Sequence, residues 1–483
     1  MDSKNTLFKN TIYKALLSLV NIVVPLIIGP YIMRLLNEEL YGIYNKAYAN
    51  YQVFFAFASF GVYTLGVREI SRIRNDEEKV SKLFTNLFVI SMLSNIVVLA
   101  IYIIFSFIVS DGITRTLYLI MGIQIVANIF YVEFVNEAVE NYRFITVKSV
   151  IVKIGYFIAV LLWVKKPDDV AHYALIVSAV NFANNIISFI YAKRRIKFDF
   201  SQIQIIRYLK PLVAVLLITN IDLLYSQLDR VMLGQYVSNI SVTEYYTAYY
   251  LISTLSAIPY AIINVSIPRL SYISTNEGKE KYEEKLNNSI SSLLFIIIPM
   301  CMGVFVMSKE AVKLYSGDKY PGLEIPLMIA CIGRIIISMQ SVMQHLVMYP
   351  NNREDRIIKV STIGGISNLV INYLLVFAKI FSPTTALLST SLVELAIFTI
   401  HYWYSKKVMK INVSFFNKKN FTYLFLSVMF IPISLFIRSF NLNFYLNMLL
   451  IILVCVLMYF IVLYIKGDQN LMFILRKLKL RRD

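Results

Sequence analysis

Long apolar runs recur along the whole chain and are separated by short polar segments. Runs of about 20 or more apolar residues have the length that a helix needs to cross the hydrocarbon core of a bilayer. The pattern predicts fourteen spanning helices, at about 12–36, 41–65, 83–109, 117–139, 145–164, 171–191, 209–236, 245–268, 288–307, 325–349, 358–379, 385–404, 421–437 and 444–465. We therefore expect an all-α integral membrane protein.

The composition agrees with this class. Of the 483 residues, 58% are hydrophobic and 16% are charged, whereas soluble domains have about 45–50% apolar and about 25% charged residues. The three cysteines lie inside apolar runs and the three histidines are far apart, which excludes a disulfide framework and zinc-ligand spacing. The sequence has no GxxxxGK[ST] phosphate loop. We expect no cofactor, no metal and no nucleotide motor.

The net charge of +18 is distributed unevenly along the chain. With the N-terminus on the inner side, the inner segments hold about four Lys or Arg residues for each one in the outer loops. This is the positive-inside pattern, which places both termini in the cytoplasm and gives no reason to expect a nucleic-acid partner. The basic tail at 467–483 is expected to face the anionic inner leaflet.

An internal similarity predicts how the helices are grouped. At one constant offset, Tyr44, Ala47 and Tyr48 recur as Tyr245, Ala248 and Tyr249. A repeat of six helices is parallel, and transporters of this plan bind substrate between their two lobes near the midplane. The predicted organisation is an N-lobe at 1–192, a cytoplasmic linker at 193–208, a C-lobe at 209–405, a helix pair at 406–466 and the tail at 467–483.

Charged residues inside the predicted spans indicate a polar cavity, since each costs roughly 2.5–3.5 kcal/mol at the bilayer centre. Helical spacing places two polar sets on one face each: Asp222, Ser226, Asp229 and Arg230, and then Arg334, Ser338, Ser341 and His345. Cations in such a cavity suit an anionic substrate, and carboxylates suit proton or sodium coupling. An ion gradient or the membrane potential is then the expected drive.

Other interpretations of these charges stay open. Snorkelling to the headgroups explains those nearer the span ends equally well, namely Arg34, Lys46, Asp229 and Arg230. Glu133 and Glu137 approach an inner helix end, where an interfacial role is the alternative. A cavity role is favoured for the three deepest charges, Asp222, Arg334 and Glu394. The 34 tyrosines fit an interfacial belt, with sugar stacking as the alternative.

Two short segments resemble one family. The run LDRVMLG at 228–234 resembles the DR-x-x-LG signature of Wzx-type polysaccharide flippases. The run RLLNEELYG at 34–42 resembles the R-L-L-G-x-x-x-Y-G segment of the same family, with Asn37 where the family commonly has Gly. The predicted order of six, six and two helices is similar to that family along nearly the whole chain.

This resemblance implies a MATE-like fold in the multidrug/oligosaccharidyl-lipid/polysaccharide exporter superfamily. It also implies that an undecaprenyl-diphosphate-linked oligosaccharide, such as a capsule or teichoic-acid precursor, moves from the inner to the outer leaflet of a bacterial cytoplasmic membrane. The implied partners are this glycan, membrane lipids and other polysaccharide-assembly membrane proteins. The implied substrate-binding residues are Arg34, Lys46, Lys153, Arg230 and Arg334. The coupling or gating candidates are Asp222, Asp229, Glu394 and Glu137.

Two rival functions are compatible with a polytopic membrane protein. A MATE-type exporter of small molecules usually has twelve spans and exports cations, so the excess of cavity Arg and Lys argues against it. A membrane glycosyltransferase or polymerase needs a catalytic carboxylate in a sizeable outer loop, whereas the longest outer loop is at about 308–324. No arrangement of nucleophile and base is readable either, so we expect a transporter and not an enzyme.

Overall fold

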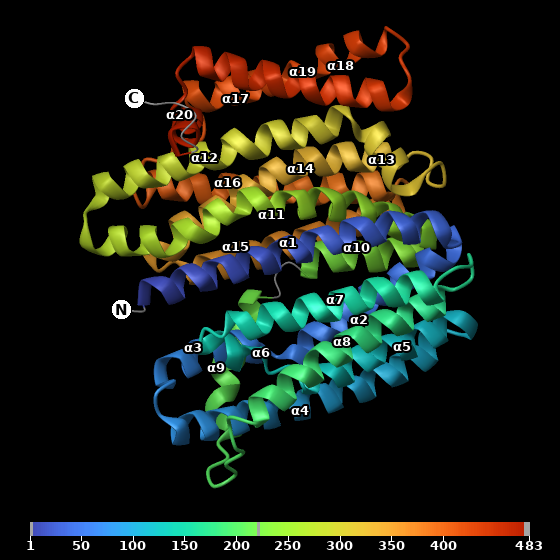
Figure 1. Ribbon diagram of the computed structural model, residues 1–483, viewed down its shortest axis with the longest axis vertical. Helices are drawn as coiled ribbons and strands as arrows, with labels where there is room; N and C mark the ends of the chain where they lie inside the picture. Colours follow the sequence, from blue (N-terminus) through green and yellow to red (C-terminus); the bar gives the residue numbers. More distant parts are fainter. Residues whose placement is uncertain (1–2, 220–222, 478–483) are drawn as a thin grey trace. The chain divides into compact units, whose positions relative to one another are not determined.

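The computed structural model describes residues 3–219 and 223–477, and these residues are helical almost throughout, with no strand among them (Figure 1). Thirteen of the described helical segments are long and apolar enough to span a membrane. The predicted span at 209–236 coincides with α9 (Ile205–Thr219) and α10 (Leu223–Tyr236), which flank the undescribed residues 220–222. The prediction of an all-α, multi-pass membrane protein is confirmed.

The chain divides into two compact units, Met1–Thr243 and Glu244–Asp483. The remaining helices that belong wholly to the first unit are α1 (Ser3–Leu35), α2 (Glu38–Ser59), α3 (Val62–Ile73), α4 (Glu77–Val109), α5 (Gly112–Ile129), α6 (Glu133–Ala138), α7 (Tyr142–Trp163) and α8 (Val170–Lys193). Within it, α5 packs between α4 and α8, α7 lies beside α8, and α10 packs against α2. The repeat-based lobe boundaries at 192 and 209 stay a prediction.

Helix α11 (Asn239–Asn276) begins in the first unit and leads into the second. The second unit continues with α12 (Lys279–Val306), α13 (Ser308–Ser316), α14 (Glu324–Val342), a π-helical turn (Met343–Met348), a 3-10 turn (Tyr349–Asn351), α15 (Glu354–Phe377), α16 (Pro383–Lys407), α17 (Lys418–Val428), α18 (Phe430–Arg438), α19 (Phe444–Ile465) and α20 (Gln469–Lys477). Here α14 packs against α12 and α16. The guanidinium of Arg438 makes a bidentate ion pair with Glu310 at 2.8 Å, which joins α18 to α13.

Local sequence explains where the helices begin and break. The Asp76 carboxylate caps α4 by accepting from the backbone N–H of Lys79 at 3.1 Å. Hydrogen bonds to Lys79 hold the pKa of Asp76 below its usual value. The predicted span at 41–65 is divided after Ser59, because Phe60 and Gly61 both adopt positive φ angles. The predicted span at 117–139 likewise divides into α5 and the short α6.

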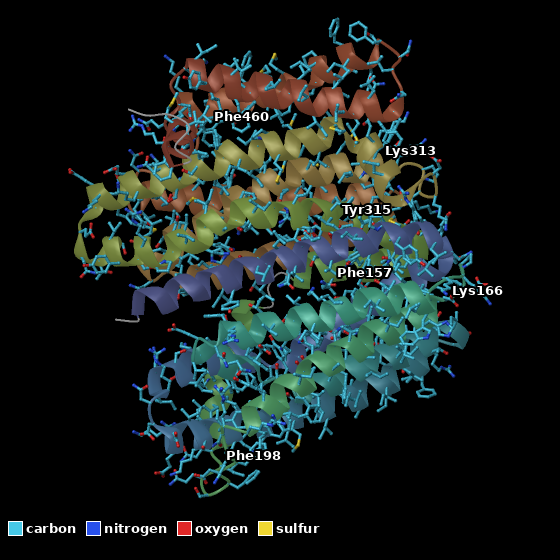
Figure 2. All side chains as sticks on the ribbon, in the orientation of Figure 1. Phe157, Lys166, Phe198, Lys313, Tyr315 and Phe460 are labelled. Atoms are coloured by element: carbon cyan, nitrogen blue, oxygen red, sulfur yellow. The ribbon has the colours of Figure 1, made fainter. Side chains whose placement is uncertain are left out.

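The burial pattern is that of a protein in lipid. Large apolar side chains such as Ile108 and Phe377 lie exposed on the helices, whereas Asn95 and Asn368 are fully buried. Charged side chains gather at helix ends, and Figure 2 shows Lys166 in the connection between α7 and α8. Phe198, after α8, lies at the other end of the first unit. The bilayer therefore has an apolar surface to contact between polar ends.

A glycine contact allows a first prediction, on stability. A Cβ atom on Gly42 of α2 would lie 2.5 Å from the backbone carbonyl of Asn239, where rigid backbone cannot yield. We expect Gly42→Ala to lower the apparent melting temperature of the detergent-solubilised protein, by a loss of about 1–3 kcal/mol from overpacking. Gly155→Ala on α7 is the matched control, because a Cβ there meets no atom within 4 Å. Equal melting temperatures for the two variants would contradict this contact.

Candidate functional site

The first candidate region lies where α10 packs against α2 in the first unit. Asp229 and Arg230 are buried on α10, and the Nε of Arg230 donates to the carbonyl of Ser226 at 3.2 Å. The Arg230 guanidinium lies 6.0 Å from the centroid of the Tyr48 ring on α2, which is within cation–π range. The flippase-like motif thus places its arginine against the aromatic face of α2.

The last residue of that motif explains the closeness of the two helices. A Cβ on Gly234 would lie 2.9 Å from the Cγ and Cδ atoms of Lys46, so the glycine lets the lysine stem lie directly against α10. On the neighbouring helix α11, the hydroxyl of Thr243 accepts a hydrogen bond at 2.9 Å from the amide of Asn45 on α2. These contacts hold Lys46 and Arg230 at one helix–helix junction.

A row of tyrosine rings continues along the same face of α2. The rings of Tyr41, Tyr44, Tyr48 and Tyr51 follow one another at centroid distances of 5.8, 6.3 and 5.8 Å. Sequence reasoning did not single out this set as a site, although its spacing of three and four residues is the signal of one helical face. Aromatic faces next to cations can stack on sugar rings.

The second candidate region surrounds Arg334 in the second unit. Arg334 lies near the middle of the span Glu324–Asn351 and is 7% exposed. Its guanidinium lies 5.1 Å from the Tyr249 ring centroid, and its Nε and Nη2 have no hydrogen-bond partner among the described residues. Ser338 and Ser341, one and two turns farther along α14, both contact the hydroxyl of Tyr260 at 3.5 and 3.4 Å. The result is a buried cation with unused donors on a polar helix face.

The helical geometry of this span changes before His345, the last residue of the predicted polar face. Residues Met343–Met348 form a π-helical turn, which holds more residues per turn than an α-helix. The His345 side chain in this turn is exposed. The buried hydroxyl of Tyr282 donates to the carbonyl of Leu346 at 2.6 Å, which satisfies one of the acceptors in this turn. His345 therefore lies in a turn that departs from regular α-helical spacing, and its place on the predicted polar face stays a prediction.

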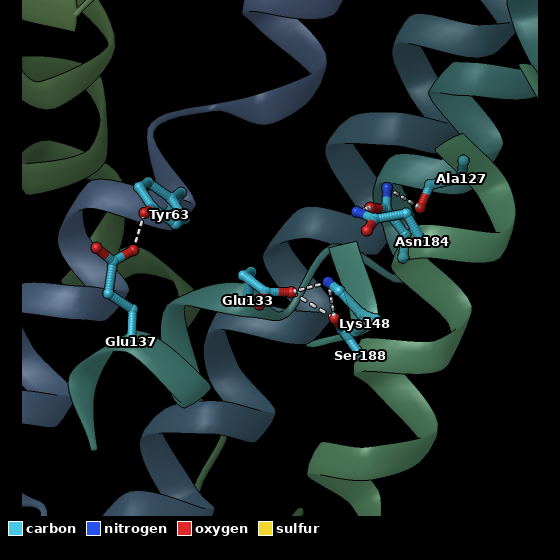
Figure 3. Close-up of polar contacts among 8 residues, drawn as sticks. Tyr63, Ala127, Glu133, Glu137, Lys148, Asn184 and Ser188 are labelled. Atoms are coloured by element: carbon cyan, nitrogen blue, oxygen red, sulfur yellow. Dashed lines mark hydrogen bonds and ion pairs between the residues drawn. The ribbon is translucent and has the colours of Figure 1, made fainter. Parts of the chain in front are cut away.

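A third polar cluster surrounds α6, and Figure 3 shows its contacts. The Nζ of Lys148 on α7 lies 2.5 Å from the Glu133 carboxylate and donates to the hydroxyl of Ser188 at 2.6 Å. Ser188 also donates to Glu133. Farther along α6, the hydroxyl of Tyr63 donates to the Glu137 carboxylate. Glu133 is buried in an ion pair, and Lys148 is a partner that the sequence pattern did not reveal.

The other described candidate residues lie on separate helices. Arg34 is exposed in the last turn of α1, and Lys153 is half-buried on α7. Glu394 is buried on α16, and Asp222 lies outside the described residues. The roles assigned to these residues stay predictions. Within the part of the chain that the structure describes, no group of three His, Cys, Asp or Glu residues is arranged to hold a metal ion.

Known proteins of similar sequence indicate the family of this chain. The model of the family described as "Polysaccharide biosynthesis protein" matches residues 7–274, which is more than half of the chain. A "Putative O-antigen transporter" of Escherichia coli (strain K12) is 22% identical over 398 residues, covering 81% of this chain and 95% of that protein. A "Probable low-salt glycan biosynthesis flippase" of Haloferax volcanii is 22% identical over 168 residues, which are 35% of each chain.

One solved structure shares the fold. The structure described as "Lipid II flippase MurJ, inward closed conformation" superposes with a TM-score of 0.71 over 95% of this chain and 99% of that chain. The sequence identity is 16%, so the likeness shows the fold alone. The predicted all-α, multi-pass membrane fold is thus shared with a solved structure.

Proposed function

Because this chain belongs to the polysaccharide biosynthesis protein family, we propose that it is a flippase that moves a lipid-linked oligosaccharide between the two membrane leaflets. The names of the relatives, an O-antigen transporter and a glycan flippase, support this substrate class. The structural observation that carries the proposal is Arg334. A buried cation inside a span is costly unless an anionic group pairs with it, and the phosphates of a lipid carrier are such a group.

We propose undecaprenyl diphosphate as the carrier and the bacterial cytoplasmic membrane as the location, with both termini in the cytoplasm and transport from the inner to the outer leaflet. The sequence motif at 228–234 and the positive-inside distribution support these assignments. The glycan is then a precursor of a surface or wall polymer, such as a capsule or a teichoic acid. Other membrane proteins of the same assembly pathway are proposed partners.

The proposed transport cycle is alternating access. The substrate-facing cations are Arg34, Lys46, Lys153, Arg230 and Arg334. The proposed coupling or gating carboxylates are Asp222, Asp229, Glu137 and Glu394. A proton or sodium gradient, or the membrane potential, drives the cycle, because the sequence holds no nucleotide-binding loop. The proposed function involves no chemical step, and the protein acts as a transporter and not as an enzyme.

Depletion of the protein in its native host tests this function. We expect one polyprenyl-diphosphate-linked saccharide to accumulate on the cytoplasmic leaflet and the matching surface polymer to decline, because synthesis continues while translocation stops. Extraction of the lipid fraction followed by mass spectrometry measures the accumulation and identifies the glycan. Re-expression of the wild-type chain is the control and is expected to reverse both changes.

The rival exporter function predicts a different result. If depletion leaves the lipid-linked saccharides and the surface polymer unchanged but raises sensitivity to small toxic compounds, the flippase proposal is wrong. The family relatives and the buried cations at positions 230 and 334 favour the flippase.

A further inference from the structure

A groove lies on the first unit between α7 and α8. It has a volume of about 600 Å³ and is lined by Asn141, Arg143, Phe144, Val147, Lys148, Ile151, Val152, Ile187, Tyr191 and Arg195. The two helices run side by side (Figure 1). The volume is in the range of about 300–1,000 Å³ that small-molecule sites commonly have.

The two exposed arginines of this groove lie at the same end of the helix pair. Arg143 is in the first turn of α7, and Arg195 follows the last turn of α8. The ring of Tyr191 stacks on that of Phe144 with centroids 3.7 Å apart, and the Arg195 guanidinium lies 4.6 Å from the Tyr191 centroid. The stacked rings of Phe144 and Tyr191 thus line the groove next to Arg195. The contact with Tyr191 keeps the Arg195 guanidinium at the mouth of the groove.

The acidic residues nearby in sequence are engaged elsewhere. Glu133 pairs with Lys148, Glu137 accepts from Tyr63, and Glu140 pairs with Arg74 at 3.1 Å. No ion pair involving Arg143 or Arg195 is formed within the described ranges 3–219 and 223–477. The mouth of the groove therefore carries two uncompensated positive charges.

Farther from the mouth the groove becomes apolar. Val147, Ile151 and Ile187 line it one to three turns deeper, and their side chains are 47%, 63% and 39% exposed. This order, cations at the helix ends and exposed aliphatic side chains toward the membrane interior, matches the order of phosphate and acyl chain in a lipid.

We propose that the groove between α7 and α8 binds an anionic phospholipid, whose phosphate lies between Arg143 and Arg195 and whose acyl chain lies along Val147 and Ile151. None of the residues that line the groove belongs to α2 or α10. The groove binds a lipid of the bulk membrane and not the transported glycan, so the proposal goes beyond the proposed function.

Native mass spectrometry of the detergent-solubilised full-length protein tests the site. The probes are phosphatidylglycerol and phosphatidylcholine with identical acyl chains. We expect phosphatidylglycerol to bind more tightly, and Arg143→Gln/Arg195→Gln to weaken its binding about tenfold or more, because each basic residue contributes about 1 kcal/mol to anionic-lipid binding. The control is Arg194→Gln/Lys197→Gln, which removes the same charge from exposed residues that do not line the groove.

Three outcomes would overturn the proposal: equal binding of the two lipids, an equal loss in both double variants, or displacement of the lipid by millimolar glycerol phosphate. The last result would indicate a site for a soluble anion. Ile151→Trp provides an independent test if the arginine variant fails to fold, because it blocks the apolar part of the groove and keeps both arginines. This variant is expected to weaken phosphatidylglycerol binding as well, and unchanged binding would contradict the site.

Discussion

Replacing Arg334 with alanine is expected to reduce translocation of the lipid-linked glycan about tenfold or more. Hydrogen bonds to a charged group contribute about 1.5–3 kcal/mol each, and about 1.4 kcal/mol corresponds to a factor of ten. The Nε and Nη2 of Arg334 have no partner among the residues described, so these donors are available to a substrate phosphate. The loss of transport is measured in depleted cells that express the variant, as the amount of surface polymer relative to cells that express the wild type.

The melting temperature of Arg334→Ala distinguishes a binding role of this residue from a structural role. A buried arginine that is paired with no carboxylate among the described side chains costs free energy in the membrane. Arg334→Ala is therefore expected to melt at the same temperature as wild type or higher, while transport is lost. Cys331→Ala, a truncation of a buried side chain one turn away on α14, is the control and should retain transport. Transport at the wild-type level in Arg334→Ala would remove this residue from the site.

Arg334→Lys refines the prediction. Lysine keeps the positive charge but loses the planar set of donors that binds phosphate oxygens in pairs. We expect transport between the levels of wild type and Arg334→Ala. If lysine restores transport completely, charge alone accounts for the contribution of Arg334.

The second large effect is expected on stability, for Lys148→Ala. The side chains of Lys148 and Glu133 are 3% and 10% exposed, so the variant leaves a buried carboxylate without its cation. Breaking a buried ion pair in this way costs about 3–5 kcal/mol. A large fall in the apparent melting temperature of the detergent-solubilised protein is the expected result.

A double variant distinguishes a lost ion pair from a lost side chain. Glu133→Gln/Lys148→Met removes both charges and keeps most of the volume, so it should regain much of the stability lost in Lys148→Ala. Lys153→Ala is the matched control, since Lys153 lies on the same helix and is half-buried, and no ion pair of the described residues includes it. If Lys148→Ala melts no lower than Lys153→Ala, the buried pair does not stabilise the first unit.

The sequence predicted the helices well but not their interruptions. Apolar runs are local features, and their lengths are sufficient to place spans that the structure confirms. The break at Phe60 and Gly61 depends on two left-handed backbone conformations within an apolar run, where hydropathy does not change. The π-helical turn at Met343–Met348 is likewise invisible to regular spacing, although it contains His345, the last residue of the predicted polar face.

The candidate site was predictable in part. Helical spacing correctly aligned Arg334, Ser338 and Ser341, since the last two residues meet the same Tyr260 hydroxyl. Lys148 is 15 residues from Glu133 and on a different helix, so no periodicity connects them. The same holds for the approach of Arg230 to Tyr48, which requires α10 to pack against α2.

The sequence by itself determined the class of protein, the positions of the membrane spans and the short motifs that indicate the family, because each depends on residues close together in the chain. The tertiary structure alone decided which buried charges are paired and which are not. Pairing depends on side chains from different helices, as between Lys148 and Glu133, whereas the buried Arg334 has no carboxylate partner in the described part of the chain. The free-energy cost of burying a charge depends on the residue and its position in the span. Whether a partner compensates for this cost depends on how the helices pack.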